Sequence, residues 1–107
     1  MKHVLFVCGR NRFRSPAAEQ IFANFPGIET ASAGLNPDAD NPLGEDLVEW
    51  ADIIFVMEEA QRQKLASRFR SSLKGVRVIC LDIPDKFRAM DPELIRLLKS
   101  KVTPHLA

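Results

Sequence analysis

The sequence has few cysteines, few histidines and no long apolar run. Cys8 and Cys80 are too few for the disulfide framework of a small secreted domain. No apolar stretch approaches the roughly 18 residues that a membrane-spanning helix needs. His3 and His105 have no neighbours at the spacing of metal ligands, so we expect no metal site. With an N-terminus unlike a signal peptide, these absences predict a cytoplasmic protein without a membrane segment.

Neither sign of charge is in excess. With 15 Lys and Arg against 14 Asp and Glu, the formal net charge is +1, which gives no overall attraction to nucleic acid or membranes. Basic residues are frequent between residues 62 and 77, but such a run is more often a solvated helix face, so we expect no nucleic-acid binding. The 107 residues, 46% of them hydrophobic, predict one domain over residues 1–107 with one core.

Apolar runs alternate with helix signals along the chain. Short runs rich in β-branched and aromatic residues predict four buried strands, over residues 3–8, 28–33, 53–57 and 76–81. Helices are predicted between and after them, over residues 16–25, around 47–50, over 58–72 and from 92 onward. The first has Ser15 as its predicted N-cap and the last has Asp91. This alternation predicts an α/β fold, a three-layer sandwich with a four-stranded parallel sheet.

The polar segment from Cys8 to Ser15 connects the first predicted strand to the first predicted helix. Its backbone N–H groups and the helix N-terminus can converge on one anion, and a phosphate dianion suits such a loop. Positive potential there favours the thiolate of Cys8, which is a nucleophile toward phosphorus. Arg14 supplies a planar guanidinium that can pair with two phosphoryl oxygens.

A simpler interpretation is that Cys8 is a buried strand-end thiol and that the arginines are solvated. For a lone cysteine this would be the better interpretation, because free cysteine packs like a small hydrophobic residue. Here a strand, a five-residue spacer, Arg14, a hydroxyl and Pro16 follow one another in the order that a phosphate-binding loop requires. We therefore favour the functional interpretation.

The run from Val4 to Glu19 (V-L-F-V-C-x5-R-S-P-A-A-E) resembles the signature of the low-molecular-weight protein tyrosine phosphatases. The resemblance continues through 32–34, 53–58 and 82–87 in the family's order. It implies a catalytic set of nucleophile, phosphate-binding arginine and general acid: Cys8, Arg14 and Asp85. It also implies a phosphate-binding loop made of Gly9, Arg10, Asn11, Arg12, Phe13, Arg14 and Ser15.

The resemblance implies supporting roles for three further polar side chains. Asn11 and Ser15 match the loop residues that hold its shape and ease departure of the thiolate, and Ser32 belongs to the same hydrogen-bond network. Expelling an alkoxide or phenoxide is difficult without a proton, so a general acid is also expected on chemical grounds. Asp85 matches the family's phrase best and Asp82 is its rival, whereas Asp91 is predicted to cap a helix. A neighbouring aromatic residue, Phe87, either walls the pocket or belongs to the core.

The sequence departs from the family at several positions. Arg10 replaces a loop glycine that can require a positive φ, and Phe13 replaces a second cysteine that could protect Cys8 as a disulfide. Lys86 replaces a proline. The segment 34–50 is short, and no aromatic residue occurs between Gly34 and Glu49 in this region, which normally supplies one side of the cleft. We therefore expect a more open pocket. Arg10, with Arg12, either favours substrates in acidic surroundings or is simply solvated.

Three functions are compatible with these residues. The first is hydrolysis of a phosphorylated protein, most simply at phosphotyrosine, or of a small aryl phosphate, through a cysteinyl-phosphate and without a cofactor. The second is a phosphate- or phosphopeptide-binding module with weak or no catalysis. The third is an arsenate reductase, which the scarcity of cysteines disfavours, since Cys80 is predicted to be a core thiol.

Overall fold

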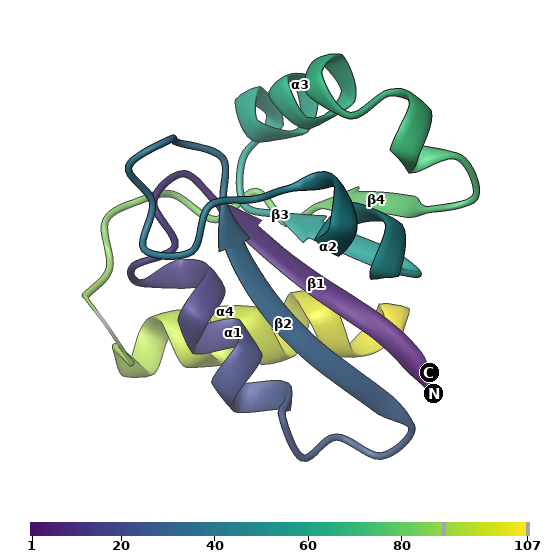
Figure 1. Cartoon of the computed structure of the whole chain (residues 1–107). Helices are drawn as coiled ribbons and strands as arrows, with labels where there is room; N and C mark the ends of the chain where they lie inside the picture. The colour runs from purple at the N-terminus through teal and green to yellow at the C-terminus, as the bar shows by residue number, and fades with distance from the viewer. Residues whose placement is uncertain (89, 107) are drawn as a thin grey trace.

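Four parallel strands form one sheet in the computed structural model, which describes residues 1–88 and 90–106 (Figure 1). The strands run in the spatial order β2-β1-β3-β4, and every adjacent pair is parallel. Their bounds are Lys2–Cys8 for β1, Ile28–Gly34 for β2, Ile53–Val56 for β3 and Arg77–Cys80 for β4. The predicted four-stranded parallel sheet is confirmed, and each strand end is within one residue of the prediction.

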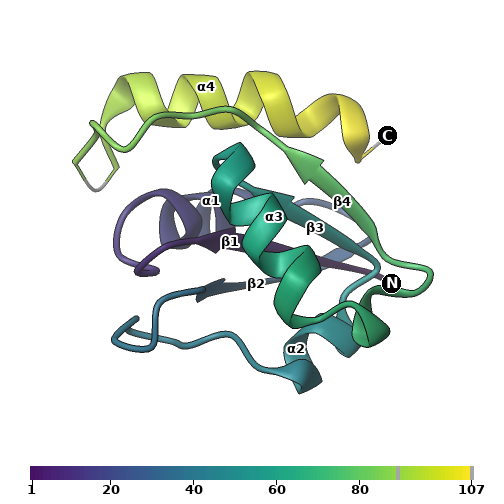
Figure 2. The same ribbon diagram turned by 90° about the horizontal axis from the view of Figure 1, so that it is seen from above.

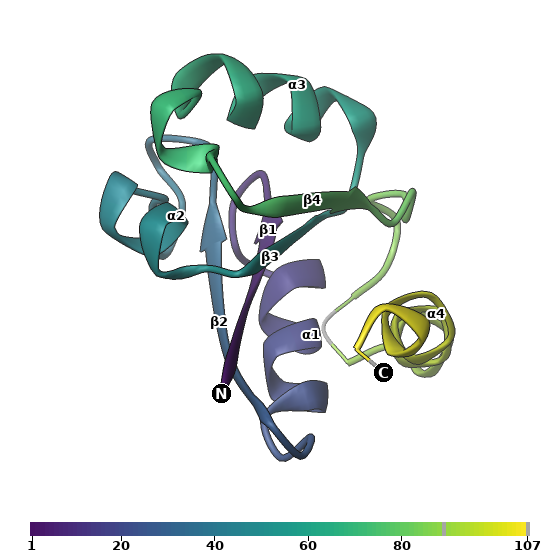
Figure 3. The same cartoon turned by 90° about the vertical axis from the view of Figure 1, so that its right-hand side faces the viewer.

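Two layers of helices enclose the sheet, as Figure 3 shows most clearly. The helices are α1 (Arg14–Phe22), α2 (Glu45–Trp50), α3 (Glu59–Arg68) and α4 (Pro92–Val102), with short 3-10 turns at Ser71–Leu73 and Thr103–His105. Helices α1 and α4 cover one face, whereas α2 and α3 cover the other (Figure 2). The predicted three-layer sandwich is therefore confirmed. No helix of the described residues is long and apolar enough to cross a bilayer.

The central strand β1 has side chains buried on both of its faces. Val4 and Phe6 belong to the core beneath α1 and α4, and Leu5 and Val7 to the core beneath α2 and α3. Phe6 stacks on Phe55 with 5.4 Å between ring centroids. Burial on both faces explains why the strand reads as a continuous apolar run rather than an alternating one. It also fixes the end of β1, with Cys8, at the carboxyl edge of the sheet.

Two helix boundaries differ from the sequence prediction. Helix α1 begins at Arg14, and its N-cap is Phe13 without a side-chain cap, because the Ser15 hydroxyl bonds to Cys8 and Asn11 instead. The same helix ends at Phe22 rather than at residue 25, which immediately precedes a proline and so is disfavoured in the helical conformation.

The charged helix predicted over 58–72 is also shorter than expected. Helix α3 ends at Arg68, and the chain continues into a separate 3-10 turn over Ser71–Leu73. The N-terminus of α4 is as predicted, because the Asp91 side chain accepts a hydrogen bond from the N–H of Glu93 at 2.9 Å.

A loop over residues 35–44 lies against the segment that follows β1. The N–H groups of Leu35, Asn36 and Asp40 donate to the carbonyl oxygens of residues 8, 9 and 10 respectively, at 2.9, 2.8 and 3.0 Å. The two segments approach so closely at Gly34 that a Cβ there would lie 2.7 Å from a carbonyl oxygen, that of residue 9. This loop therefore fixes the backbone that begins the candidate site.

Candidate active site

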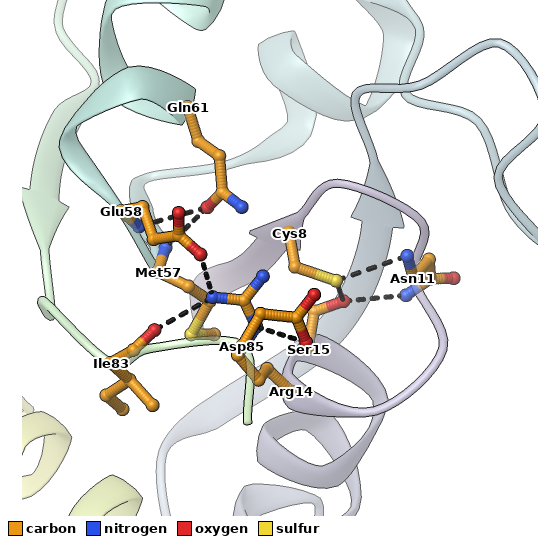
Figure 4. Close-up of polar contacts among 9 residues, drawn as sticks. All are labelled: Cys8, Asn11, Arg14, Ser15, Met57, Glu58, Gln61, Ile83 and Asp85. Atoms are coloured by element: carbon orange, nitrogen blue, oxygen red, sulfur yellow. Dashed lines mark hydrogen bonds and ion pairs between the residues drawn. The ribbon is translucent and has the colours of Figure 1, made fainter. Parts of the chain in front are cut away.

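Cys8 is buried, with 3% of its surface exposed, and its sulfur lies among hydrogen-bond donors (Figure 4). The backbone N–H of Asn11 donates to Sγ at 3.1 Å, and Sγ lies 2.9 Å from the Ser15 hydroxyl oxygen. That hydroxyl oxygen in turn accepts a hydrogen bond from Asn11 Nδ2 at 2.9 Å. Because the hydroxyl oxygen already accepts a hydrogen bond from the amide, its own hydrogen can point at the sulfur. The arrangement suits a thiolate acceptor.

The loop turns sharply at Asn11, which has a φ of 58°. Asparagine adopts this left-handed conformation more readily than most residues. Arg10, the residue for which the sequence raised the question of a positive φ, does not have one. The residue with the left-handed conformation is thus Asn11, and Arg10 has no such backbone strain.

The loop and the start of α1 present backbone donors to the same space. The N–H groups of residues 12–15 have no acceptor among the described residues, and the first helical hydrogen bond of α1 is donated by the N–H of Ala17 to Phe13. The positive end of the nine-residue helix adds to their potential. These groups form a suitable cradle for an oxyanion in front of Cys8.

Arg14 is anchored on one side of its guanidinium group. Its Nη1 donates to Glu58 at 2.5 Å and to the carbonyl oxygen of Ile83 at 2.8 Å (Figure 4). The Nε and Nη2 atoms make no hydrogen bond within the described residues. They form the edge of the guanidinium that can bind two oxygens of one anion side by side.

Asp85 reaches the same guanidinium from the segment after β4. Its Oδ1 lies 3.7 Å from Nε of Arg14, and its side chain is 67% exposed. The segment that carries it continues the pairing of β4 with the end of β3, since Ile83 N–H donates to the carbonyl of Met57. Asp82 has a φ of 56° and lines a neighbouring hollow rather than the space before Cys8. Of the two candidate acids, only Asp85 lines the pocket with Cys8.

A pocket of about 380 Å³ lies in front of the sulfur. Its lining includes most of the residues that the sequence singled out, namely Cys8, Gly9, Arg10, Arg12, Phe13, Arg14 and Asp85, together with Asn36. Asn11 and Ser15 lie behind the sulfur as its hydrogen-bond partners. Phe13 is 43% exposed and supplies the aromatic surface of the pocket.

One sequence prediction is corrected here, and one pair of alternatives is decided. Ser32 does not join the network around Cys8, because its hydroxyl donates to Oε1 of Glu19 on α1 at 2.5 Å. Phe87 does not wall the pocket, since it is only 6% exposed and packs into the core beneath α1 and α4. Apolar burial of the ring outweighs any role at the rim.

Two residues of the site have no clear sequence signal. Glu58 follows β3 at the carboxyl edge of the sheet, and its backbone is fixed by Gln61, whose Oε1 accepts from the N–H groups of Met57 and Glu58. Asn36 reaches the pocket because its own N–H pairs with the carbonyl of Gly9. The available indications for Glu58 were its position directly after a buried strand and its place in the segment 53–58 that resembles the family, neither of which gave it a role.

The second thiol lies away from the first. Cys80 is the register partner of Val56, which pairs in turn with Val7, so two strand spacings, about 9–10 Å, separate it from β1. It also packs against the core on the opposite face from Cys8. A disulfide needs Cα atoms within about 7 Å, so Cys80 is unsuited to bridging Cys8. Within residues 1–88 and 90–106, no group of three or more His, Cys, Asp or Glu side chains is placed to hold a metal ion.

No family model and no curated protein is a significant match to the chain in sequence. Solved structures match it in fold. The tyrosine phosphatase Wzb from Escherichia coli K30, in complex with phosphate, has a TM-score of 0.79 and 19% identity over 97% of this chain and 95% of that one.

Two other structures agree with this match. The low-molecular-weight protein tyrosine phosphatase SP-PTP from Streptococcus pyogenes has a TM-score of 0.79 and 17% identity over 99% and 91% of the two chains. The YwlE arginine phosphatase from Geobacillus stearothermophilus has a TM-score of 0.73 and 22% identity over 94% and 84%. The chain therefore has the fold of the low-molecular-weight protein tyrosine phosphatases, in agreement with the resemblance found in its sequence.

Proposed function

We propose that this protein is a cysteine-dependent phosphatase that hydrolyses phosphomonoesters through a cysteinyl-phosphate. The observation that carries the proposal is the hydrogen-bonded sulfur of Cys8, which faces a pocket shared with Arg14 and Asp85. The fold it shares with named phosphatases supports the same conclusion. No metal or organic cofactor enters the proposed reaction.

In the first step the phosphoryl group lies in the cradle of backbone N–H groups, with two of its oxygens on Nε and Nη2 of Arg14. The thiolate of Cys8 attacks phosphorus as the bond to the leaving oxygen breaks. Asp85 donates its proton to that oxygen, which leaves as a neutral alcohol or phenol. Glu58 and the carbonyl of Ile83 hold the far side of the guanidinium while charge moves among the phosphoryl oxygens.

In the second step water replaces the departed alcohol. Asp85, now a carboxylate, accepts a proton from the water as its oxygen attacks phosphorus, and the phosphorus–sulfur bond breaks. Inorganic phosphate forms and the electron pair returns to Cys8. The Ser15 hydroxyl and the Asn11 N–H stabilise the thiolate as it leaves, because both lie within hydrogen-bond distance of Sγ.

The substrate class we propose is an aryl phosphate, either phosphotyrosine in a protein or a small aryl ester. The exposed ring of Phe13 at the pocket wall offers a surface for an aromatic leaving group. Of the three structures described above, two are named as tyrosine phosphatases and one as an arginine phosphatase. Phosphoarginine is therefore the competing substrate to compare.

The test is turnover of p-nitrophenyl phosphate, phosphotyrosine and phosphoarginine by the purified protein in the presence of EDTA. We expect aryl phosphates to be hydrolysed, with phosphotyrosine preferred over phosphoarginine, and we expect Cys8→Ser to abolish turnover. Tight phosphate binding without turnover would instead identify a binding module. Unchanged turnover by the Cys8→Ser variant would refute the proposed nucleophile.

A further inference from the structure

Three arginines line the pocket, and they differ in how their charges are balanced. Arg14 is paired with Glu58 and Asp85. Nε of Arg12 lies 3.6 Å from Oδ1 of Asp40. Arg10 has no ion-pair partner among residues 1–88 and 90–106, although it lines the pocket with the other two. One cation at the mouth of the site is therefore uncompensated by the protein.

The backbone that carries Arg10 is held in place. Its carbonyl oxygen accepts a hydrogen bond from the N–H of Asp40 at 3.0 Å. The next residue, Asn11, is fixed in its left-handed conformation by bonds to Cys8 and Ser15. The side chain of Arg10 is exposed to solvent. A guanidinium on a fixed backbone can bind an anion without first reorganising the loop that holds the phosphoryl group.

The surface next to the pocket at Asp85 has the other sign of charge. The hollow beside the pocket is lined by four acids, Glu58, Glu59, Asp82 and Asp85, and it shares Asp85 with the pocket. A second anion on a substrate would be repelled there and attracted on the side of the phosphate-binding loop. The two sides together therefore dictate the direction in which such a substrate lies.

We propose that Arg10 is a specificity-determining residue, which binds a second anionic group of the substrate beside the phosphoryl group. The preferred substrates are accordingly phosphomonoesters that carry a carboxylate or a further phosphate close to the scissile ester. This proposal rests on the proposed phosphatase function and adds to it the charge of the substrate's surroundings. Arg14 binds the scissile phosphoryl group, whereas Arg10 binds the neighbouring anion.

The experiment compares two phosphotyrosine peptides that differ only by Asp or Asn next to the phosphorylated residue, together with a carboxyphenyl phosphate and its carboxamide. For the unmodified protein we expect kcat/KM to be roughly two- to five-fold higher for each anionic member, as for an exposed charge pair. In Arg10→Gln both ratios should fall to about one. Comparing the variant with the unmodified protein on the same pair cancels differences in the leaving groups.

Arg12→Gln and Arg77→Gln provide matched controls. Arg12 is already paired with Asp40, and Arg77 is exposed at the opposite end of the sheet, so both variants should keep the preference for the anionic members. The preference should also weaken as salt is raised, because exposed charges are screened. Equal rates for both members in the unmodified protein, or an unchanged preference in Arg10→Gln, would overturn the proposal.

Measurements of peptide binding test the role of Arg10 separately from the proposed phosphatase function. The Cys8→Ser variant cannot form the cysteinyl-phosphate, so its affinities for the Asp and Asn peptides report recognition alone. We expect the Asp peptide to bind more tightly here as well, and Arg10→Gln combined with Cys8→Ser to bind both equally. If the unmodified protein hydrolysed neither peptide but showed this difference in binding, the phosphatase function would fail and the role of Arg10 would stand. Equal binding would contradict that role.

Discussion

At the scale of single residues, the site is defined by which atoms donate to the sulfur of Cys8. The Ser15 hydroxyl and the Asn11 N–H are both within hydrogen-bond distance, and Asn11 also orients the hydroxyl. Such buried donors act on developing charge without the reorganisation that water would need. The sulfur therefore differs from an ordinary strand-end thiol in its hydrogen bonds rather than in its burial.

The Ser15 hydroxyl is the first donor to test. We expect Ser15→Ala to lower kcat by about 100-fold, because one donor to the departing thiolate is lost. Ser32→Ala is a matched control, since that buried hydroxyl bonds to Glu19 instead. It should lower the free energy of unfolding by about 1 kcal/mol and leave kcat unchanged. Steady-state kinetics and thermal unfolding of both variants measure this, and equal kinetic losses would contradict the assignment.

The proposed role of Asp85 as general acid is tested by comparing substrates whose leaving groups differ in their need for a proton. An Asn at this position keeps the shape of the side chain but donates no acidic proton to the leaving oxygen. For Asp85→Asn we expect kcat/KM to fall by 10²–10⁴-fold with phenyl phosphate. With p-nitrophenyl phosphate the fall should be much smaller, because nitrophenolate leaves without a proton.

The control for that experiment is Asp82→Asn. Asp82 lies in the neighbouring hollow, so its substitution should leave the dependence on the leaving group as it is in the unmodified protein. If Asp82→Asn steepened this dependence and Asp85→Asn did not, Asp82 rather than Asp85 would be the general acid.

At the scale of elements, the proposed phosphate-binding loop depends on its neighbour, the loop over residues 35–44. Three backbone hydrogen bonds join the two segments. They satisfy the carbonyl groups of residues 8–10. The segment 81–83 is held in a similar way, since Lys101 of α4 donates to the carbonyl of Leu81 at 2.9 Å. Each of these two segments is thus held by hydrogen bonds from another part of the chain.

Gly34 is where this dependence can be tested. A Cβ there would lie 2.5 Å from that of Ala39 and 2.7 Å from the carbonyl oxygen of Gly9, so Gly34→Ala must move the backbone. We expect kcat/KM to fall about 100-fold, since small displacements of catalytic groups are costly. Gly27→Ala is the control, because its φ of 81° strains the substitution at the opposite end of β2. It should reduce stability by about 1 kcal/mol without changing kcat/KM.

At the scale of the whole molecule, anion binding and folding are linked, because the cradle exists only in the folded chain. At a phosphate concentration 100 times Kd, binding adds about 2.7 kcal/mol to the free energy of unfolding. For a domain of this size we expect Tm to rise by roughly 10 °C. Arg14→Lys, measured in the same buffer, should show less than half of this rise because the paired donors are lost. An equal rise in the variant would mean that phosphate acts only as a general stabilising salt.

The fold was predictable because its strands are buried on both faces. The apolar runs of β1 and β3 marked the sheet, and the segment from Cys8 to Arg14 marked the loop at its edge. The start of α1 was not predictable. Serine is a preferred N-cap residue, but the hydroxyl of Ser15 is hydrogen-bonded to the sulfur of Cys8 instead. Local signals compete with tertiary contacts at such positions.

Long-range pairs were the other part that the sequence could not supply. The bond between Ser32 and Glu19 joins a strand to a helix, and the contact between Arg14 and Glu58 joins residues 44 positions apart. Neither pair has a spacing along the chain that produces a periodic pattern in the sequence. Phe87 had two plausible locations after a turn, and only the packing of α4 against the sheet places it in the core.

The central claim, that Cys8 attacks phosphorus, is tested most directly by trapping its product. Rapid mixing with an excess of p-nitrophenyl phosphate, followed by quenching and mass spectrometry of the digested protein, measures the alcohol released and the state of Cys8 together. We predict an early burst of nitrophenol that approaches the amount of protein, and one phosphoryl group on the peptide that contains Cys8. Steady turnover with neither a burst nor a phosphorylated Cys8 peptide would contradict the claim.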